Sequence, residues 1–179
     1  MKPKVIWFTG LPCSGKTTLA EMLPPLLRFG GQKVVHLDGD VIREMMGNPN
    51  FQPADRDVHI RYIGLTAALL QKTGCWVIAS FISPYEDSRN FVRELCEDFL
   101  EIYLSTPRIY CEKRDVKGMY EKAVRGEISN FTGVSAPYEP PKNPDIILDT
   151  SKMTVFSCLR IILKEIAEES LGDKNESQS

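Results

Sequence analysis

The chain has 179 residues, of which 42% are hydrophobic and 26% charged, and its net charge at pH 7 is −2. This length fits one compact domain that can bury a core without disulfides or a structural metal. The weak negative charge argues against a broad nucleic-acid-binding surface. The sequence has no apolar run long enough to span a membrane and no signal peptide at its start. We therefore expect no nucleic acid and no membrane as partners.

The cysteines are odd in number and form no CxxC pair. They are Cys13, Cys75, Cys96, Cys111 and Cys158. This usage argues against a disulfide framework or a zinc site. A reducing compartment suits such a chain, and we expect it in the cytoplasm.

The first predicted element is a buried strand over residues 5–9, followed by a loop over residues 10–15 and a helix over residues 16–28. The loop and the first two helical residues match G-x-x-x-x-G-K-[ST], with Gly10, Leu11, Pro12, Cys13, Ser14, Gly15, Lys16 and Thr17. In such a loop the backbone N–H groups cradle phosphates. Lys16 is expected to reach the terminal phosphates of ATP, and the Thr17 hydroxyl to bind Mg²⁺.

The second predicted strand, over residues 33–37, leads into Asp38-Gly39-Asp40. Either carboxylate can hold metal-bound water or accept the proton of an acceptor hydroxyl. The alternative is a turn that caps the next helix. Arg43 and Arg56 follow, with Phe51 between them, and suit an anionic ligand that carries a base. Their alternative is a solvated helix face.

The rest of the chain alternates in the same way. Pro53 and Asp55 are expected to open a long helix, which a strand over 75–80 follows. Next come a helix over 83–98 that opens on a Ser83–Glu86 capping box, a strand over 99–104 and a short helix from Thr106-Pro107. A strand over 146–148 and a helix over 153–171 complete the chain. Residues 115–143 lack periodicity and predict a partly helical lid. Residues 1–172 are expected to form the single domain, and residues 173–179 a polar tail.

Strands that alternate with helices predict right-handed βαβ units. The expected fold is an α/β/α three-layer sandwich of the P-loop NTPase type, with a five-stranded parallel sheet. Ligands bind such sheets at the carboxyl ends of the strands. Residues 10–17, 38–43, 81–85 and the stretch after residue 104 all fall there, so we expect one shared site.

Several segments together resemble the adenylylsulfate (APS) kinase family, from about residue 4 to residue 150. They are GLPCSGKT, LDGDVIR, FQPADRDVHIRYIG, IASFISPYEDSR, EKRDVKGMYEKAVRGEISNFTG and SAPYEPPKNPDIILDT. The resemblance implies transfer of the γ-phosphate of ATP to the 3′-hydroxyl of APS, giving PAPS and ADP in sulfate assimilation. It also implies a homodimer and functional coupling to an ATP sulfurylase on a separate chain.

The resemblance also implies roles for individual residues. Asp38 corresponds to the catalytic, Mg²⁺-organising aspartate, and Arg114 to a residue on the ATP side. The expected APS-binding residues are Asp40, Arg43, Phe51, Arg56, Ile82, Ser83, Lys117 and Phe131, with His59 where the family usually has asparagine. A serine at the Ser83 position is described in the family as a phosphoenzyme intermediate. We favour direct transfer, with Ser83 in contact with the acceptor.

Two alternatives stay open at this stage. A gluconate-, shikimate- or nucleotide-type kinase shares the phosphate loop and the sheet, although the Phe51 and Phe131 pair argues against a sugar acceptor. A domain that only senses nucleotide is the other alternative, and the intact Lys16, Thr17 and Asp38 argue against it.

Overall fold

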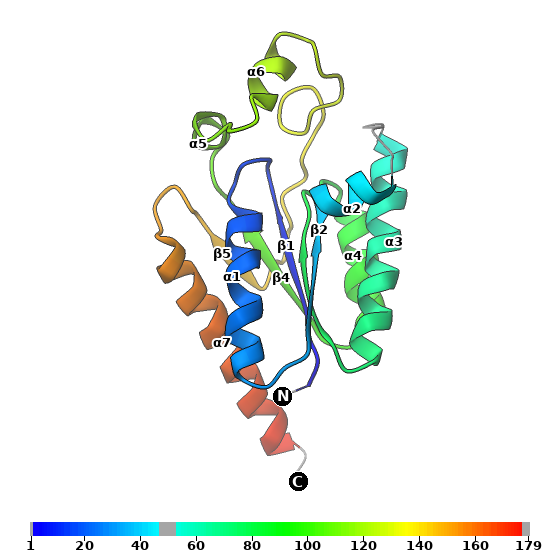
Figure 1. Cartoon of the computed structure of the whole chain (residues 1–179), viewed down its shortest axis with the longest axis vertical. Coiled ribbons are helices and arrows are strands. Elements are labelled where there is room, and N and C mark those ends of the chain that lie inside the picture. Colours follow the sequence, from blue (N-terminus) through cyan, green and yellow to red (C-terminus); the bar gives the residue numbers. More distant parts are fainter. Residues whose placement is uncertain (1, 47–52, 177–179) are drawn as a thin grey trace.

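The computed structural model describes residues 2–46 and 53–176. Its centre is a five-stranded, all-parallel sheet in the order β2-β3-β1-β4-β5 (Figure 1). The strands are β1 (Val5–Gly10), β2 (Val34–Asp38), β3 (Trp76–Ser80), β4 (Phe99–Leu104) and β5 (Ile146–Leu148). The predicted parallel α/β sheet is thereby confirmed.

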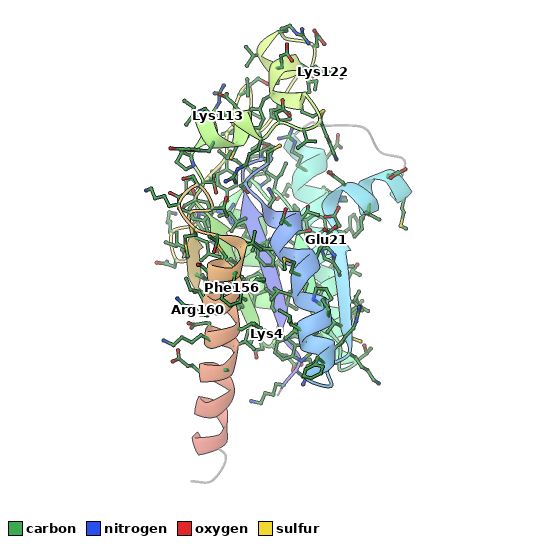
Figure 2. The ribbon with its side chains drawn as sticks, turned by 60° about the vertical axis from the view of Figure 1, so that its left-hand side comes forward. Lys4, Glu21, Lys113, Lys122, Phe156 and Arg160 are labelled. Atoms are coloured by element: carbon green, nitrogen blue, oxygen red, sulfur yellow. The ribbon has the colours of Figure 1, made fainter. Side chains whose placement is uncertain are left out.

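Helices cover both faces of the sheet, with α1 and α7 on one side and α3 and α4 on the other (Figure 1). The helices are α1 (Lys16–Phe29), α2 (Gly39–Met46), α3 (Pro53–Lys72), α4 (Glu86–Leu95), α5 (Arg108–Lys113), α6 (Met119–Val124) and α7 (Val155–Glu176). Figure 2 shows Glu21 on α1, and Phe156 and Arg160 on α7. No helix within the described ranges is both long enough and apolar enough to cross a bilayer.

The central strand β1 feeds both cores, because successive side chains of a strand point to opposite faces. Ile6 and Phe8 pack under α1 and α7, whereas Val5 and Trp7 pack under α3 and α4. All six residues of β1 are buried. A strand covered on both faces reads as a continuous apolar run, which is why the sequence predicted this element well.

A third, smaller cluster lies at the carboxyl edge of the sheet, in the segment that holds α5 and α6. Its buried members are Cys111, Tyr120, Ala123 and Phe131. Figure 1 shows this segment standing beyond the strand ends, at the opposite end of the molecule from both termini. Lys113 and Lys122 lie on it in Figure 2. The segment contains most of residues 115–143, for which we keep the name lid.

The capping box predicted at Ser83 does not form. The helix α4 begins at Glu86, and Ser83 has a left-handed backbone with φ 39°. The Glu86 N–H instead donates to the carboxylate of Glu139, at 2.8 Å. A carboxylate from a distant segment thus stabilises the start of this helix, as negative charge does at a helix N-terminus. At its other end α4 stops at Leu95, before the predicted residue 98.

Candidate functional site

The phosphate loop leaves β1 at Gly10, where only glycine fits. Gly10 has φ 145°, and a Cβ atom there would lie 2.8 Å from the carbonyl oxygen of Leu104 on the neighbouring strand. The loop then closes around the Lys16 side chain. The Lys16 ammonium donates to the carbonyl oxygens of Gly10 and Leu11, at 3.0 and 2.6 Å. The loop therefore holds its lysine inward, beside the helix N-terminus that binds phosphate.

Lys16 is buried, and burial lowers the pKa of its ammonium group from 10.5 to about 8. Desolvation disfavours the charged form of a lysine. An anion placed in the loop would oppose this effect, because an opposite charge nearby favours the ammonium form. A polyphosphate bound in the loop would therefore stabilise the charged form of Lys16.

Asp38, the last residue of β2, stands beside the loop. Its Oδ2 accepts hydrogen bonds from Thr17 Oγ1 at 3.1 Å and Ser80 Oγ at 2.9 Å. Its Oδ1 accepts from the N–H groups of Asp40 and Val41, at 2.9 and 3.2 Å. Burial raises the pKa of this carboxyl, but the hydrogen bonds outweigh burial and leave the pKa below its usual value. Asp38 is therefore ionised at neutral pH.

One of the two sequence interpretations of Asp38, the cap on the next helix, is confirmed. Through Oδ1 the side chain caps α2, the short helix that follows directly, while through Oδ2 it faces Thr17 of the phosphate loop. Asp40, on α2, contacts the lid instead. Its carboxylate accepts from the Lys117 ammonium at 2.5 Å, and this hydrogen bond raises the pKa of Lys117. Both side chains of this pair are largely exposed.

A cavity of about 1230 Å³ joins these groups. It is larger than a usual single-ligand pocket of roughly 300–1,000 Å³, so it has room for two nucleotides. The predicted site residues that line it are Pro12, Cys13, Gly15, Lys16, Thr17, Asp38, Asp40, Arg56, His59, Ile82, Ser83, Arg114, Lys117 and Phe131. Gly10, Leu11 and Ser14 belong to the loop but not to this lining. Phe51 lies outside the described residues, as does the side chain of Arg43 on α2.

One wall of the cavity joins α3 to the lid. The Arg56 guanidinium donates to Thr132 Oγ1 at 2.7 Å and to the carbonyl oxygen of Asn130. Phe131 stands between these two lid residues in the sequence, and its ring meets the ring of Tyr120 edge-on, with the two centroids 4.9 Å apart. An arginine and an aromatic ring on one wall can together recognise an anionic group and a base.

Ser83 turns its hydroxyl into the protein. It is 1% exposed, accepts a hydrogen bond from Trp7 Nε1 at 3.1 Å, and donates to Thr9 Oγ1 at 3.0 Å. Its carbonyl oxygen accepts from the buried Arg89 guanidinium at 2.7 Å. The hydroxyl is thus already engaged on both sides.

Comparison with known proteins identifies this arrangement. The family model described as adenylylsulphate kinase matches residues 2–149. An adenylyl-sulfate kinase from Chloroflexus aurantiacus is 48% identical over 160 residues, covering 89% of this chain and 86% of the relative. The structure of the Mycobacterium tuberculosis APS kinase in complex with AMPPNP and APS superposes with a TM-score of 0.87, at 35% identity, over 93% of this chain and 98% of that one.

The chain belongs to the adenylylsulfate kinase family. It is an adenylylsulfate kinase, which phosphorylates APS to PAPS in sulfate assimilation. An adenylyl-sulfate kinase from Halothermothrix orenii agrees, with 44% identity over 168 residues, 93% of this chain and 91% of the relative.

Sequence reasoning missed one side of this kinase cavity, where Arg114 meets the loop after β5. The Arg114 guanidinium donates to Thr150 Oγ1 and to the Thr150 carbonyl oxygen, both at 2.7 Å. Thr150 Oγ1 in turn donates to the carbonyl oxygen of Ser14, at 2.8 Å. Four more residues line this side, namely Thr18, Met153, Thr154 and Val155. The available signal was the position of Thr150 just past the last predicted strand, at the edge where ligands bind.

The residues present fit a magnesium ion. Mg²⁺ in kinases is held by one or two protein oxygens together with substrate phosphates, rather than by a cage of side chains. Thr17 Oγ1 and Asp38 Oδ2 are neighbouring oxygens of this kind, 3.1 Å apart. Among the described residues, no group of three or more His, Cys, Asp or Glu side chains could hold a metal by itself.

Proposed function

We propose that the cavity beside the phosphate loop holds ATP and APS together, and that the γ-phosphoryl group of ATP passes in line to the 3′-hydroxyl of APS. The observation that carries this proposal is the common cavity that Lys16, Asp38 and Phe131 line. A phosphate-binding cation, an ionised carboxylate and an aromatic wall are the three parts that such a transfer to a nucleotide needs.

On the ATP side, Lys16 and the loop N–H groups bind the β- and γ-phosphates and offset the charge on the transferring group. Arg114 and the residues around Thr150 surround the adenine. Thr17 and Asp38 would hold Mg²⁺, which neutralises phosphate charge when it is bound. Gly10, Leu11, Pro12, Cys13, Ser14 and Gly15 form the cradle.

On the APS side, the Asp38 carboxylate, which its lowered pKa keeps ionised, orients the 3′-hydroxyl. It accepts the proton of that hydroxyl as the hydroxyl oxygen attacks the phosphorus. Arg56 binds the phosphosulfate, and Phe131 stacks on the adenine together with Phe51. Lys117 exchanges its contact with Asp40 for one with substrate phosphate. The other residues assigned to this side are Asp40, Arg43, His59, Ile82 and Ser83.

Direct transfer needs no phosphoserine. The Ser83 hydroxyl is buried and engaged with Trp7 and Thr9, so attack on ATP would require it to leave both partners. We assign Ser83 to the shape of the acceptor wall.

We further propose that residues 1–172 act as one domain with residues 115–143 as a closing lid, and that the protein works as a homodimer in the cytoplasm. A hexameric APS kinase from Thiobacillus denitrificans, of which this chain covers 29%, shows that such kinases assemble. An ATP sulfurylase on a separate chain would supply the APS.

A coupled assay of ADP release tests the proposal. With ATP and Mg²⁺, we expect ADP formation that depends on APS, and PAPS in equal amount by chromatography. Gluconate, shikimate and nucleoside monophosphates serve as alternative acceptors and should give only background. ADP release at the same rate with and without APS would contradict the proposal.

A further inference from the structure

The acceptor wall, formed by Ile82 and Ser83, lines the cavity beside the phosphate loop and has a strained backbone. Ser83 has φ 39°, a left-handed conformation that glycine adopts far more readily than serine. A residue stays in such a conformation only where the surrounding structure fixes it, and strained residues of this kind cluster at functional sites. The contacts that fix Ser83 therefore bear on the acceptor.

The hydroxyl of Thr9, a buried residue of β1, joins both residues of the wall. Thr9 Oγ1 donates to the Ile82 carbonyl oxygen at 2.8 Å and accepts from Ser83 Oγ at 3.0 Å. The Tyr138 hydroxyl lies 2.9 Å from the same Thr9 oxygen. Because a threonine hydroxyl has a single hydrogen and Ile82 receives it, Tyr138 is the donor in this pair. Burial raises the pKa of the Tyr138 hydroxyl, which keeps it protonated for this role.

A buried arginine holds the backbone of the wall. Arg89, on α4, is 1% exposed, and its guanidinium donates to the carbonyl oxygens of Ser83 and Glu139, at 2.7 Å each. The Glu139 N–H donates in turn to the Pro84 carbonyl oxygen at 2.8 Å. Glu101 balances the guanidinium charge, with its Oε1 3.1 Å from Arg89 Nε. Arg89 thereby ties the backbone of the wall to the backbone at Glu139.

Tyr138 and Glu139 lie at the end of the lid, where the chain returns to β5 (Figure 1). This end of the lid is therefore fixed to the acceptor wall through two separate links, one at a side chain and one at the backbone. In the described structure, Thr9, Arg89 and Tyr138 are not part of the cavity lining. They can act on a bound acceptor only through the wall.

We propose that Tyr138 and Arg89 are positioning residues for APS, because they hold Ile82 and Ser83 in the strained conformation that shapes the acceptor side of the cavity. The assignment rests on the proposed function, in which APS lies against this wall. The two residues set the affinity for APS. They leave the affinity for ATP unchanged, since the contacts described above for Lys16 involve neither of them.

Calorimetry on the AMPPNP complex tests the role of Tyr138. Tyr138→Phe removes the hydroxyl but keeps the ring, which stacks on Tyr103 with the two centroids 6.0 Å apart. We expect the dissociation constant of APS to rise about fivefold or more, as for one lost hydrogen bond, and that of AMPPNP to change less than about twofold. Tyr103→Phe is the matched control, because in the described structure the Tyr103 hydroxyl belongs to the same stacked pair but makes no hydrogen bond to the wall. It should bind both ligands as the wild type does.

Steady-state kinetics and calorimetry test the role of Arg89. Arg89→Lys keeps a positive charge opposite Glu101 but lacks the fixed fork that reaches two carbonyl oxygens. We expect APS affinity to fall about fivefold or more, and turnover at saturating APS to stay within about threefold, because the wall binds the acceptor without reacting. Arg93→Lys is the control, since Arg93 also pairs with Glu101 but does not contact the wall in the described structure. If Arg89→Lys does not fold, the Tyr138→Phe result decides.

The outcomes separate this assignment from the proposed function. A wild type that does not bind APS in the presence of AMPPNP would overturn both. A wild type that binds APS, with Tyr138→Phe binding it equally well, would overturn the positioning role alone. Equal losses of APS and AMPPNP affinity in Tyr138→Phe would show a general loosening of the fold and would also overturn that role. So would a loss of APS affinity in Tyr103→Phe as large as the loss in Tyr138→Phe.

Discussion

At the scale of single residues, the two carboxylate oxygens of Asp38 have different partners. Oδ1 caps α2, and Oδ2 faces Thr17 of the phosphate loop. In Asp38→Asn, one oxygen can still accept the N–H groups that begin α2, so the fold should persist. The negative charge beside Thr17 is lost, and we expect turnover to fall about 100-fold or more, within the usual range for a lost general base. ATP affinity, measured by calorimetry, should change less than about threefold. Ser80→Ala is the control, since it removes one hydrogen bond but keeps the carboxylate. Near-normal turnover in Asp38→Asn would remove Asp38 from the chemistry.

Lys16 links nucleotide affinity to pH. In the free protein its pKa is about 8, because burial disfavours the ammonium form. Bound phosphates favour that form, so the pKa rises in the complex and binding takes up a proton above pH 8. ATP affinity should therefore be highest below pH 8 and should fall by up to about tenfold per pH unit above it. Calorimetry in two buffers of different ionisation enthalpy measures the proton uptake directly. Affinity that rises from pH 8 to pH 9 would contradict this assignment.

A substitution at Ser83 should lower the stability of the fold without stopping phosphoryl transfer. Ser83→Ala removes the acceptor of the buried Trp7 Nε1–H, and an unpaired buried donor costs about 1–3 kcal/mol. Turnover at a temperature where the variant is folded should stay within about tenfold of the wild type, because direct transfer does not use the hydroxyl. Thermal unfolding and steady-state kinetics give the two values. A folded variant without any activity would instead support a phosphoenzyme.

At the scale of elements, the contact between α3 and α4 depends on a glycine. A Cβ atom at Gly64 would lie 2.4 Å from Cγ2 of Val92, a buried and stiff side chain. Alanine in a helix is favoured over glycine by about 1 kcal/mol, yet overpacking costs about 1–3 kcal/mol. We expect Gly64→Ala to lower the free energy of unfolding. Adding Val92→Ala should recover part of that loss by freeing the space. A Gly64→Ala variant more stable than the wild type, measured by urea unfolding, would refute this packing argument.

The sequence predicted some elements better than others for physical reasons. The five strands were found to within about one residue at each end. For β1 and β3 the reason is burial on both faces, which makes the strand an apolar run that stops where the site begins. Local pattern failed at Ser83, because the partner that stabilises the start of α4 is Glu139, distant in sequence. The loop residues around Thr150 were not predicted as part of the site for the same reason, because their contacts with Arg114 and Ser14 exist only after folding.

At the scale of the whole molecule, the kinase has two bodies with the cavity between them. The sandwich holds two large cores, and the lid has a small core of its own around Tyr120 and Phe131. Three contacts that join the lid to the sandwich border the cavity. They are Tyr120 with the Pro12 carbonyl oxygen, Arg56 with Asn130 and Thr132, and Lys117 with Asp40. Surface ion pairs such as the last contribute about 0–1 kcal/mol, so this link is easily exchanged for a substrate contact.

The separation of the lid from the sandwich predicts which segment becomes more ordered when the substrates bind. APS binding adds contacts from Arg56, Lys117 and Phe131 across the gap, so the lid should close as one unit around both substrates. Hydrogen exchange with AMPPNP and APS together should slow at amides of residues 115–136 by at least about tenfold relative to AMPPNP alone, because each tenfold slowing corresponds to about 1.4 kcal/mol of added local stability. Amides of β1 and β4 should not change, since they already lie in the buried sheet. Lys117→Ala is the control, in which the same substrates should slow the lid amides less. Slowing confined to the phosphate loop would mean that the lid does not respond to APS, and the division into two bodies would then have no part in catalysis.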